Sequence, residues 1–388
     1  MMKTLFRHRP VRWAAYTLLA LLTLECCSRL EDRIRQQAPL DRPYTIDSVF
    51  HDGPDGRHGR PGAHFAKWSM NSLGYRSPEP RPDSSVRVLT FGASETFGLY
   101  ESAGQEYPRQ LERELQRRGL ERAEVINVAL PGMRIGHADY LREAIARLRP
   151  QWVLLYPSPA NYIGAEASLC HEGATARPVR MTPPPEQFEP PPPRAHLRLA
   201  GKVEQVVKPL LPLKMTVAMK RLSIRRAEAG GEVMDRLPEP MLGHFLADLS
   251  CTARVVESMG ARPLLVTHAT VFGPGFERGD GLMLTNWRSF YPELREDGFL
   301  DMERRAAEGV RALARARQLP LADASAQLPG GTENFADFVH FTDAGAAHMA
   351  RLVADTLLQA SGPQATRPQL TAAVGPLPGQ SDPVTRVR

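Results

Sequence analysis

Short apolar segments alternate with helical segments between residues 86 and 358. Five apolar segments are predicted strands, at residues 86–92, 124–130, 151–156, 263–268 and 320–322. Helical patterns follow them, at residues 107–118, 137–149, 241–259, 300–317 and 343–358. Strands that alternate with helices build a parallel sheet that helices cover on both faces. The alternation therefore predicts an α/β three-layer sandwich around a five-stranded parallel sheet.

An insertion at residues 164–240 interrupts this alternation. It carries eight prolines between Pro178 and Pro193, which exclude regular helix and central strand there. The basic and apolar stretch at residues 202–222 follows. This stretch could be an amphipathic helix, over the active site or on a membrane surface, or it could be an ordinary surface excursion.

The two ends of the chain lie outside the α/β pattern. Residues 29–85 are rich in Arg, Asp, Pro and Gly without a sustained period, which favours a juxtamembrane stalk and surface extension, with order beginning at Val86. The α/β domain is then expected over residues 86–360. Residues 361–388 are rich in Pro, Gln, Thr and Gly and are predicted to be disordered.

Residues 1–28 resemble a membrane-targeting segment. A basic start precedes the apolar run Trp13–Leu24, and no small-x-small cleavage site follows it. We therefore expect an uncleaved signal-anchor, with the basic end on the cytoplasmic side and the rest of the chain exported. A cleaved signal peptide and a buried helix of a soluble protein are the alternatives.

The charge balance argues against a nucleic-acid-binding domain. The net charge is +6, but Lys3, Arg7, Arg9 and Arg12 supply four of those charges, and the rest of the chain carries 45 basic and 43 acidic side chains. A nucleic-acid footprint needs a basic face on the folded domain.

Two cysteines, Cys170 and Cys251, flank most of the insertion. In an oxidising compartment they could close a loop of about 80 residues through a disulfide. Two unrelated buried thiols are the alternative.

A serine and a histidine–aspartate pair carry the candidate chemistry. Ser94 lies between two glycines, in the loop that follows the first predicted strand, where ligands of open parallel sheets bind. It could be the nucleophile of a strand-to-helix turn or a helix N-cap. Asp337 and His340 are three residues apart just before the last helix. A serine nucleophile needs an imidazole as its base, and the imidazole needs a carboxylate to orient it.

Other polar residues have simpler explanations. Ser158 has no adjacent histidine–aspartate pair and is predicted to be a turn serine. His268 ends a predicted strand and could line the cleft, although a packed, hydrogen-bonded histidine is favoured. His348 has no ligand spacing that supports a metal site with His340. Residues 92–98 lack the Gly-Lys-Ser/Thr ending of a phosphate-binding loop.

These residues together resemble the SGNH or GDSL hydrolases. The first block of that family is similar to residues 92–98, with Ala93 where the family usually has Asp. The second block is similar to residues 127–132, the third is only partly kept at residues 159–162, and the fifth matches residues 337–340. The resemblance covers about residues 86–358 without the insertion, and implies the flavodoxin-like fold of that family.

The resemblance also implies a role for each matched residue. Ser94 would attack an ester carbonyl, His340 would take its proton, and Asp337 would orient His340. The oxyanion hole would consist of the backbone N–H groups of Ser94 and Gly132 and the side-chain amide of Asn161. No cofactor and no metal ion are implied.

The substrate is less constrained than the reaction. The stretch Asn71–Ser77 resembles one found in membrane-anchored bacterial SGNH proteins associated with extracellular polysaccharides. We expect an esterase or transferase acting on O-acetyl or short O-acyl groups of envelope glycans. It would be anchored to the inner membrane with its catalytic domain on the outer side, and polysaccharide-assembly proteins could be partners. A lipase or small-ester hydrolase with residues near 200 as a lid is one alternative, and a glycan-binding or assembly protein with weak catalysis is another.

Overall fold

The computed structural model describes residues 9–362, apart from 42–43, 54–55, 172, 174, 176–177, 180–196 and 277–280. The predicted disordered tail lies almost wholly outside the described residues, as do most of the prolines of the insertion.

One five-stranded sheet forms the centre of the molecule, with all neighbouring strands parallel. Its spatial order is β6-β5-β7-β8-β9, in which the strands are β5 (Val86–Gly92), β6 (Ala123–Asn127), β7 (Trp152–Tyr156), β8 (Arg262–Val266) and β9 (Leu321–Ala322). The chain runs from β5 outward to β6 and then returns past β5 to β7. This reversal places β5 at the switch point where open α/β sheets bind ligands.

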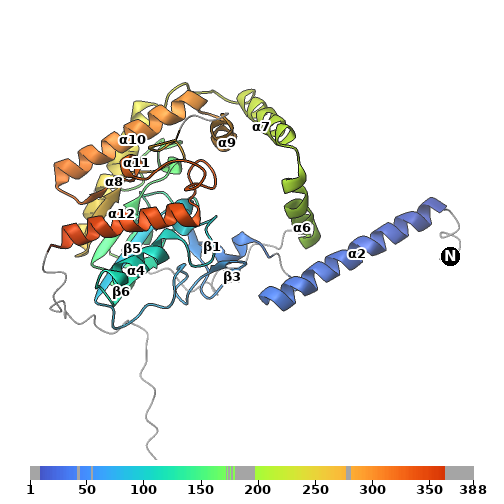
Figure 1. The fold of residues 1–388 in the computed structure, drawn as a ribbon, viewed down its shortest axis with the longest axis horizontal. Helices are drawn as coiled ribbons and strands as arrows, with labels where there is room; N and C mark the ends of the chain where they lie inside the picture. The colour runs from blue at the N-terminus through green and yellow to red at the C-terminus, as the bar shows by residue number, and fades with distance from the viewer. Residues whose placement is uncertain are drawn as a thin grey trace, which may run out of the picture.

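Helices cover both faces of the sheet, as predicted. On one face α4 (Tyr107–Arg117) and α12 (Asp343–Ser361) pack side by side (Figure 1). The other face carries α5 (Ala138–Leu148), α8 (Glu239–Ser258) and α10 (Glu296–Arg317). Because helices cover both faces of the sheet, nearly all of β5 is buried, and its sequence is an almost continuous apolar run. The exceptions are Val86, which is half-buried, and Arg87, which is buried but charged.

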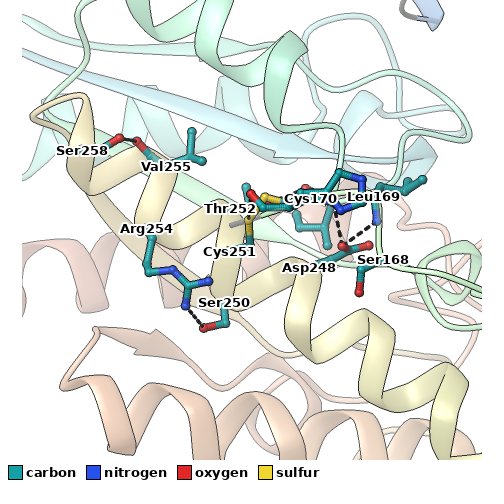
Figure 2. Close-up of a disulfide and its surroundings, with 12 residues drawn as sticks. Ser168, Leu169, Cys170, Asp248, Ser250, Cys251, Thr252, Arg254, Val255 and Ser258 are labelled. Atoms are coloured by element: carbon teal, nitrogen blue, oxygen red, sulfur yellow. Dashed lines mark hydrogen bonds between the residues drawn. A yellow bond between two sulfur atoms is a disulfide. The ribbon is translucent and has the colours of Figure 1, made fainter. Parts of the chain in front are cut away.

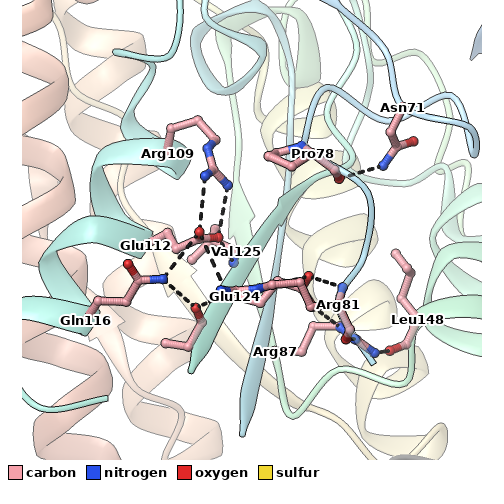
Figure 3. Close-up of polar contacts among 11 residues, drawn as sticks. Asn71, Pro78, Arg81, Arg87, Arg109, Glu112, Gln116, Glu124, Val125 and Leu148 are labelled. Atoms are coloured by element: carbon pink, nitrogen blue, oxygen red, sulfur yellow. Dashed lines mark hydrogen bonds and ion pairs between the residues drawn. The ribbon is translucent and has the colours of Figure 1, made fainter. Parts of the chain in front are cut away.

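Arg87 is the one charged residue inside β5, and it is fully buried. Its guanidinium forms an ion pair with Glu124 of β6, with 2.6 Å between Nε and Oε2 (Figure 3). The two residues are direct neighbours in the strand register. Glu124 also accepts the backbone N–H of Arg81 at 2.6 Å. The pair fastens the segment before β5 to the end of the sheet where β5 and β6 begin.

The segment before β5 is part of the folded domain. It forms η1 (Ile46–Val49), the hairpin of β1 (Phe50–Gly53) and β2 (Gly56–Gly59), and a second hairpin of β3 (His64–Phe65) and β4 (Trp68–Ser69). Val49, Phe50, Met70 and Tyr75 are buried in the main core. The prediction that order begins at Val86 is therefore wrong. Strands of two to four residues are too short to show an alternating hydrophobic pattern. A few separate apolar side chains anchor this segment to the core, so the sequence gives no periodic signal of it.

Three helices stand at one edge of the molecule (Figure 1). They are α2 (Arg9–Gln36), α6 (Arg198–Val207) and α7 (Leu213–Glu228), with the single turn η5 (Lys208–Leu210) between the last two. The carboxylate of Glu25 in α2 accepts the backbone N–H groups of Arg198 and Leu199, at 3.2 and 2.9 Å, and so caps α6. Among the helices in the described part of the chain, none has a stretch both long and apolar enough to cross a membrane.

A disulfide joins Cys170 to Cys251 of α8 (Figure 2). The neighbouring side chain of Asp248 accepts the backbone N–H groups of Leu169 and Cys170, at 2.8 and 2.9 Å. The alternative of two separate thiols is wrong. The bond fastens the start of the insertion to the helix that follows it.

Candidate active site

Ser94 lies at the first position of α3 (Ser94–Phe97), directly after the carboxyl end of β5. The turn requires Gly92, because a Cβ there would lie 2.4 Å from the Thr96 hydroxyl oxygen and 2.8 Å from a backbone oxygen of β7. The N-cap is Ala93, so the interpretation of Ser94 as a helix N-cap is wrong. The Ser94 side chain is half-buried, and its hydroxyl donates to Glu95 Oε2 at 3.3 Å.

Arg76 holds the turn that carries Ser94. Its guanidinium is buried, donates to the backbone oxygens of Phe97 and Gly98, and lies 4.9 Å from the centre of the Phe97 ring. It also pairs with Glu106 at 3.3 Å. Arg76 belongs to the stretch Asn71–Ser77, which therefore has a structural task beside the candidate nucleophile.

The structure brings Asp337 and His340 into direct contact. Asp337 Oδ2 lies 2.7 Å from His340 Nδ1, while Asp337 Oδ1 accepts the backbone N–H groups of Val339 and His340 at 2.9 and 2.8 Å. A carboxylate at Nδ1 fixes the tautomer in which Nδ1 carries the proton and Nε2 is an acceptor. His340 Nε2 is buried and has no hydrogen-bond partner within the described residues. The pair thus offers one open basic nitrogen.

The charges around this pair strengthen its basicity. Burial lowers the pKa of His340, but the hydrogen bond to Asp337 and the negative charges of Glu95, Asp337 and Glu101 together raise that pKa above its usual 6.5. Burial raises the pKa of Asp337, but the bonds from His340 and the backbone lower it below its usual value. The Tyr100 ring lies 5.0 Å from the His340 ring and covers part of it.

No hydrogen bond joins Ser94 to His340, although the Tyr100 ring, six residues after Ser94, lies 5.0 Å from the His340 ring. The carboxylate of Glu95, adjacent to Ser94, interacts electrostatically with His340. The Ser94 hydroxyl nevertheless points to Glu95, and His340 Nε2 remains open. For the predicted transfer of the Ser94 proton to His340, the hydroxyl would have to turn from Glu95 to His340 Nε2.

Gly132 and Asn161 lie in the loops after the strands on either side of β5. Gly132 has a left-handed backbone, with φ of 79°, in the loop after β6. Asn161 is buried in η2 (Pro159–Asn161) after β7. Its Oδ1 accepts the backbone N–H of Ile135 at 2.6 Å, which ties η2 to the loop of Gly132, and its Nδ2 donates to Ser158 Oγ at 3.0 Å. Ser158 therefore orients Asn161.

A second acidic and basic cluster lies behind Ser94, and sequence reasoning missed most of it. The His268 ring is buried after β8, with Nδ1 2.9 Å from Glu303 Oε2 and Nε2 3.5 Å from Glu95 Oε1. Burial lowers the pKa of His268, but the charges and hydrogen bonds of Glu303 and Glu95 raise it to about 9. The ring is therefore a cation at neutral pH that balances two carboxylates. The packed, hydrogen-bonded histidine favoured by the sequence is confirmed.

One signal in the sequence could have indicated this cluster. Glu95 is the single charged residue among the apolar residues around Ser94, and a carboxylate there needs a buried partner. Glu303 lies in a helix with many charges, where no pattern distinguishes it. Within the described residues, no three His, Cys, Asp or Glu side chains are placed to hold a metal ion.

The chain is similar in structure to solved GDSL lipases and acylhydrolases. A lipase/acylhydrolase from Enterococcus faecalis shares 16% sequence identity with a TM-score of 0.39, over 70% of this chain and 95% of that one. A GDSL-like lipase from Bacteroides thetaiotaomicron shares 12% identity with a TM-score of 0.39, over 71% and 89%. For an acetyl xylan esterase the identity is 14% and the TM-score 0.38, over 70% and 100%. No protein-family model and no curated protein matches the sequence. Identities and TM-scores this low do not carry a function over to this chain.

Proposed function

We propose that the chain is a serine esterase or acyltransferase of the SGNH type. The observation that carries this proposal is the Asp337–His340 pair, at 2.7 Å, whose Nε2 is buried and open and whose ring lies 5.0 Å from the ring of Tyr100, six residues after Ser94. A buried, carboxylate-oriented imidazole with an open nitrogen has the form of a general base. The half-buried hydroxyl of Ser94 stands just after the carboxyl end of β5.

In the proposed reaction, His340 Nε2 takes the Ser94 proton while Ser94 Oγ forms a bond to the ester carbonyl carbon. The carbonyl π electrons move to the oxygen, and the N–H groups of Ser94, Gly132 and Asn161 would stabilise this oxyanion. The bond to the alcohol then breaks, and the alcohol leaves with the proton from His340. Water or a second hydroxyl resolves the acyl ester of Ser94 by the same steps in reverse. Hydrolysis and transfer differ only in that acceptor.

For the substrate, we propose O-acetyl or short O-acyl groups on envelope polysaccharide. The support is the resemblance of Asn71–Ser77 to the corresponding stretch of membrane-anchored polysaccharide-associated proteins, together with the place of Arg76 beside the candidate nucleophile. A lipase is the second candidate, and the exposed apolar side chains of α6 and α7 favour it. Turnover of p-nitrophenyl acetate against longer acyl chains separates the two, because a lipase prefers the longer chains.

We also propose that the catalytic domain works outside the cytoplasm, anchored to the inner membrane through residues 1–28. Two features support this location: the basic start before an apolar run, and the disulfide, which is stable in oxidising compartments. Protease accessibility in spheroplasts tests it. A domain that stays protected while the inner membrane is intact would contradict the proposal.

The catalytic proposal is tested with the full chain and its Ser94→Ala variant. Removal of residues 1–28 would delete Glu25, which caps α6, so truncation is avoided. We expect p-nitrophenyl acetate turnover to fall by at least about 10³-fold in Ser94→Ala, with loss of an acetyl adduct seen by mass spectrometry on Ser94.

Ser158→Ala is the matched control, because Ser158 is a second buried serine one strand away. It should keep the adduct on Ser94 and lose less than about 10²-fold in turnover, because Asn161 is less well oriented but keeps its N–H groups. Undiminished turnover in Ser94→Ala would defeat the assignment. No turnover and no adduct in the unmodified chain would favour a binding role or a transferase that needs its own acyl donor.

A further inference from the structure

The exposed large hydrophobic side chains of the described residues gather on two neighbouring parts of the molecule. Of 22 such side chains, ten lie on α2 and seven lie between residues 203 and 222. The second group belongs to α6, η5 and α7, which we call the α6–α7 arm (residues 198–228). Apolar surface that gathers in this way marks an interaction site, whereas scattered single residues do not.

The apolar side chains of the arm follow helical spacing. Val203, Val206, Val207 and Leu210 recur at i, i+3, i+4 and i+7, and their exposed fractions are 50%, 65%, 43% and 76%. On α7, residues 215, 219 and 222 recur at i, i+4 and i+7 with exposed fractions of 53%, 54% and 50%. Each set therefore lies on one face of its helix, and each face is open.

The opposite face of α7 is already occupied. Ile224 is buried, Lys220 donates to Asn286 of α9 (Leu282–Phe290), and Arg288 of α9 pairs with Glu228. Figure 1 shows α7 outside α9, with the rest of the arm reaching toward α2. One face of α7 therefore packs on the domain, and the outward apolar face is not needed for that packing.

The charge of the arm identifies what covers this face. The arm, residues 198–228, contains eight basic and two acidic side chains. Lys214, Arg221 and Arg225 are exposed and, by their spacing of seven and four, lie together along one side of the apolar stripe of α7. An apolar face beside basic residues is typical of helices that lie in the interface of an anionic membrane.

We propose that the α6–α7 arm lies in the interface of an anionic lipid bilayer, with Met215, Met219 and Leu222 turned toward the acyl chains. This goes beyond the proposed anchoring through residues 1–28 and rests on it for location. The arm is held beside α2 by Glu25 and by the ion pair of Lys202 with Glu31, at 2.7 Å, so both parts can reach one surface.

The inner face of α7 connects this surface to the active site. α7 packs against α9, and the Trp287 ring of α9 lies 5.3 Å from the ring of Phe338, which is adjacent to Asp337. An arm bound to lipid would hold the candidate active site beside the bilayer. The substrate class that fits is an ester presented at a membrane surface, such as an acylated glycan still attached to a lipid carrier.

The test places a dye on the arm of the full chain. Cys26→Ser and Cys27→Ser remove the free thiols, and Met219→Cys then supplies one thiol for an environment-sensitive fluorophore, while the disulfide stays intact. Leu19→Cys in α2 is the parallel probe. With phosphatidylglycerol vesicles we expect a blue shift at position 219, and a much weaker one with phosphatidylcholine alone.

Charge variants sharpen the test. Each basic residue near an anionic surface contributes about a fivefold factor in binding, so replacing three should weaken lipid contact at position 219 about 100-fold. The arm variant is Lys214→Gln, Arg221→Gln and Arg225→Gln, and its control with the same net charge is Arg113→Gln, Arg304→Gln and Arg351→Gln.

Five results would overturn the proposal. A blue shift at position 19 without one at position 219 would mean that α2 contacts lipid and the arm does not. No shift at either position would mean that neither part contacts lipid. Equal shifts with the two lipids, or equal loss in both charge variants, contradict an anionic surface. A blue shift that grows with protein concentration in the absence of lipid would mean that a second copy of the chain covers the apolar face of α7. Esterase activity on a soluble ester is measured separately, so failure of the arm and failure of the catalytic proposal are distinguishable.

Discussion

Asp337→Asn is the substitution that tests the candidate catalytic machinery most directly. The Asp337 Oδ1 atom accepts two backbone N–H groups, of Val339 and His340, and an asparagine Oδ1 can keep both. The other oxygen accepts the proton of His340 Nδ1 at 2.7 Å, and an asparagine presents an N–H group there instead. The variant therefore keeps the two backbone hydrogen bonds that hold the loop, while the group that faces His340 Nδ1 changes from an acceptor to a donor.

The magnitude follows from the tautomer. With an N–H group facing Nδ1, the neutral imidazole carries its proton on Nε2, and Nε2 can no longer accept a proton from Ser94. Placing the wrong tautomer in a serine–histidine–aspartate site costs about 10⁴-fold in turnover, which is about 5.5 kcal/mol of transition-state free energy. We expect kcat/KM for p-nitrophenyl acetate to fall by about 10⁴-fold, and the free energy of unfolding to change by at most about 1 kcal/mol.

The assay compares Asp337→Asn, Ser94→Ala and the double variant, with unfolding in urea as the stability control. Residues that act as one unit lose activity together, so the double variant should be no slower than the worse single variant. A loss below about tenfold in Asp337→Asn, or losses that multiply in the double variant, would show that Asp337 does not act through His340 on Ser94.

Three further predictions concern charge, packing and the disulfide. Glu95→Gln removes a negative charge that raises the pKa of His340, and since the base must be neutral, the acid limb of the activity profile should move to lower pH; a move to higher pH would contradict this. Glu124→Gln leaves its arginine partner buried without a counter-charge and should cost about 3–5 kcal/mol in urea unfolding, whereas Glu308→Gln, in an exposed pair, should cost under about 1 kcal/mol; equal costs would refute the argument. Cys251→Ser opens a loop of sequence separation 81 and should lower stability by about 4 kcal/mol without reductant, and an unchanged urea midpoint would contradict it.

The sheet and its covering helices were predictable because their hydrophobic residues recur at regular spacing in the sequence. All five strands and the five helices that cover them were predicted within a few residues of their observed bounds, since strands buried on both faces are short apolar runs and amphipathic helices repeat every 3.6 residues. The pairing of Asp337 with His340 was predictable for a similar reason, because residues three apart in a turn are neighbours in space.

The remaining features depend on contacts between distant parts of the chain. His268 and Glu303 come from β8 and α10, and their meeting with Glu95 depends on the order of strands in the sheet. Arg76 reaches the turn of Ser94 from a segment that reads as an irregular extension. Such contacts leave no period in the sequence, and only the folded arrangement of the strands brings these residues together.

Glu95 joins the two halves of the site and has opposite effects on them. Its charge raises the pKa of His340, which in the proposed mechanism would favour deprotonation of the serine. Its Oε2 also accepts the Ser94 hydroxyl at 3.3 Å, which would hold the proposed nucleophile away from that base. His268, as a cation between Glu95 and Glu303, fixes where the Glu95 carboxylate lies. In the proposed mechanism the described site would therefore be a resting arrangement, in which His340 Nε2 is open and the Ser94 hydroxyl is held by Glu95. A substrate that displaces the hydroxyl from Glu95 would complete the proton path, so binding and activation would occur in the same step.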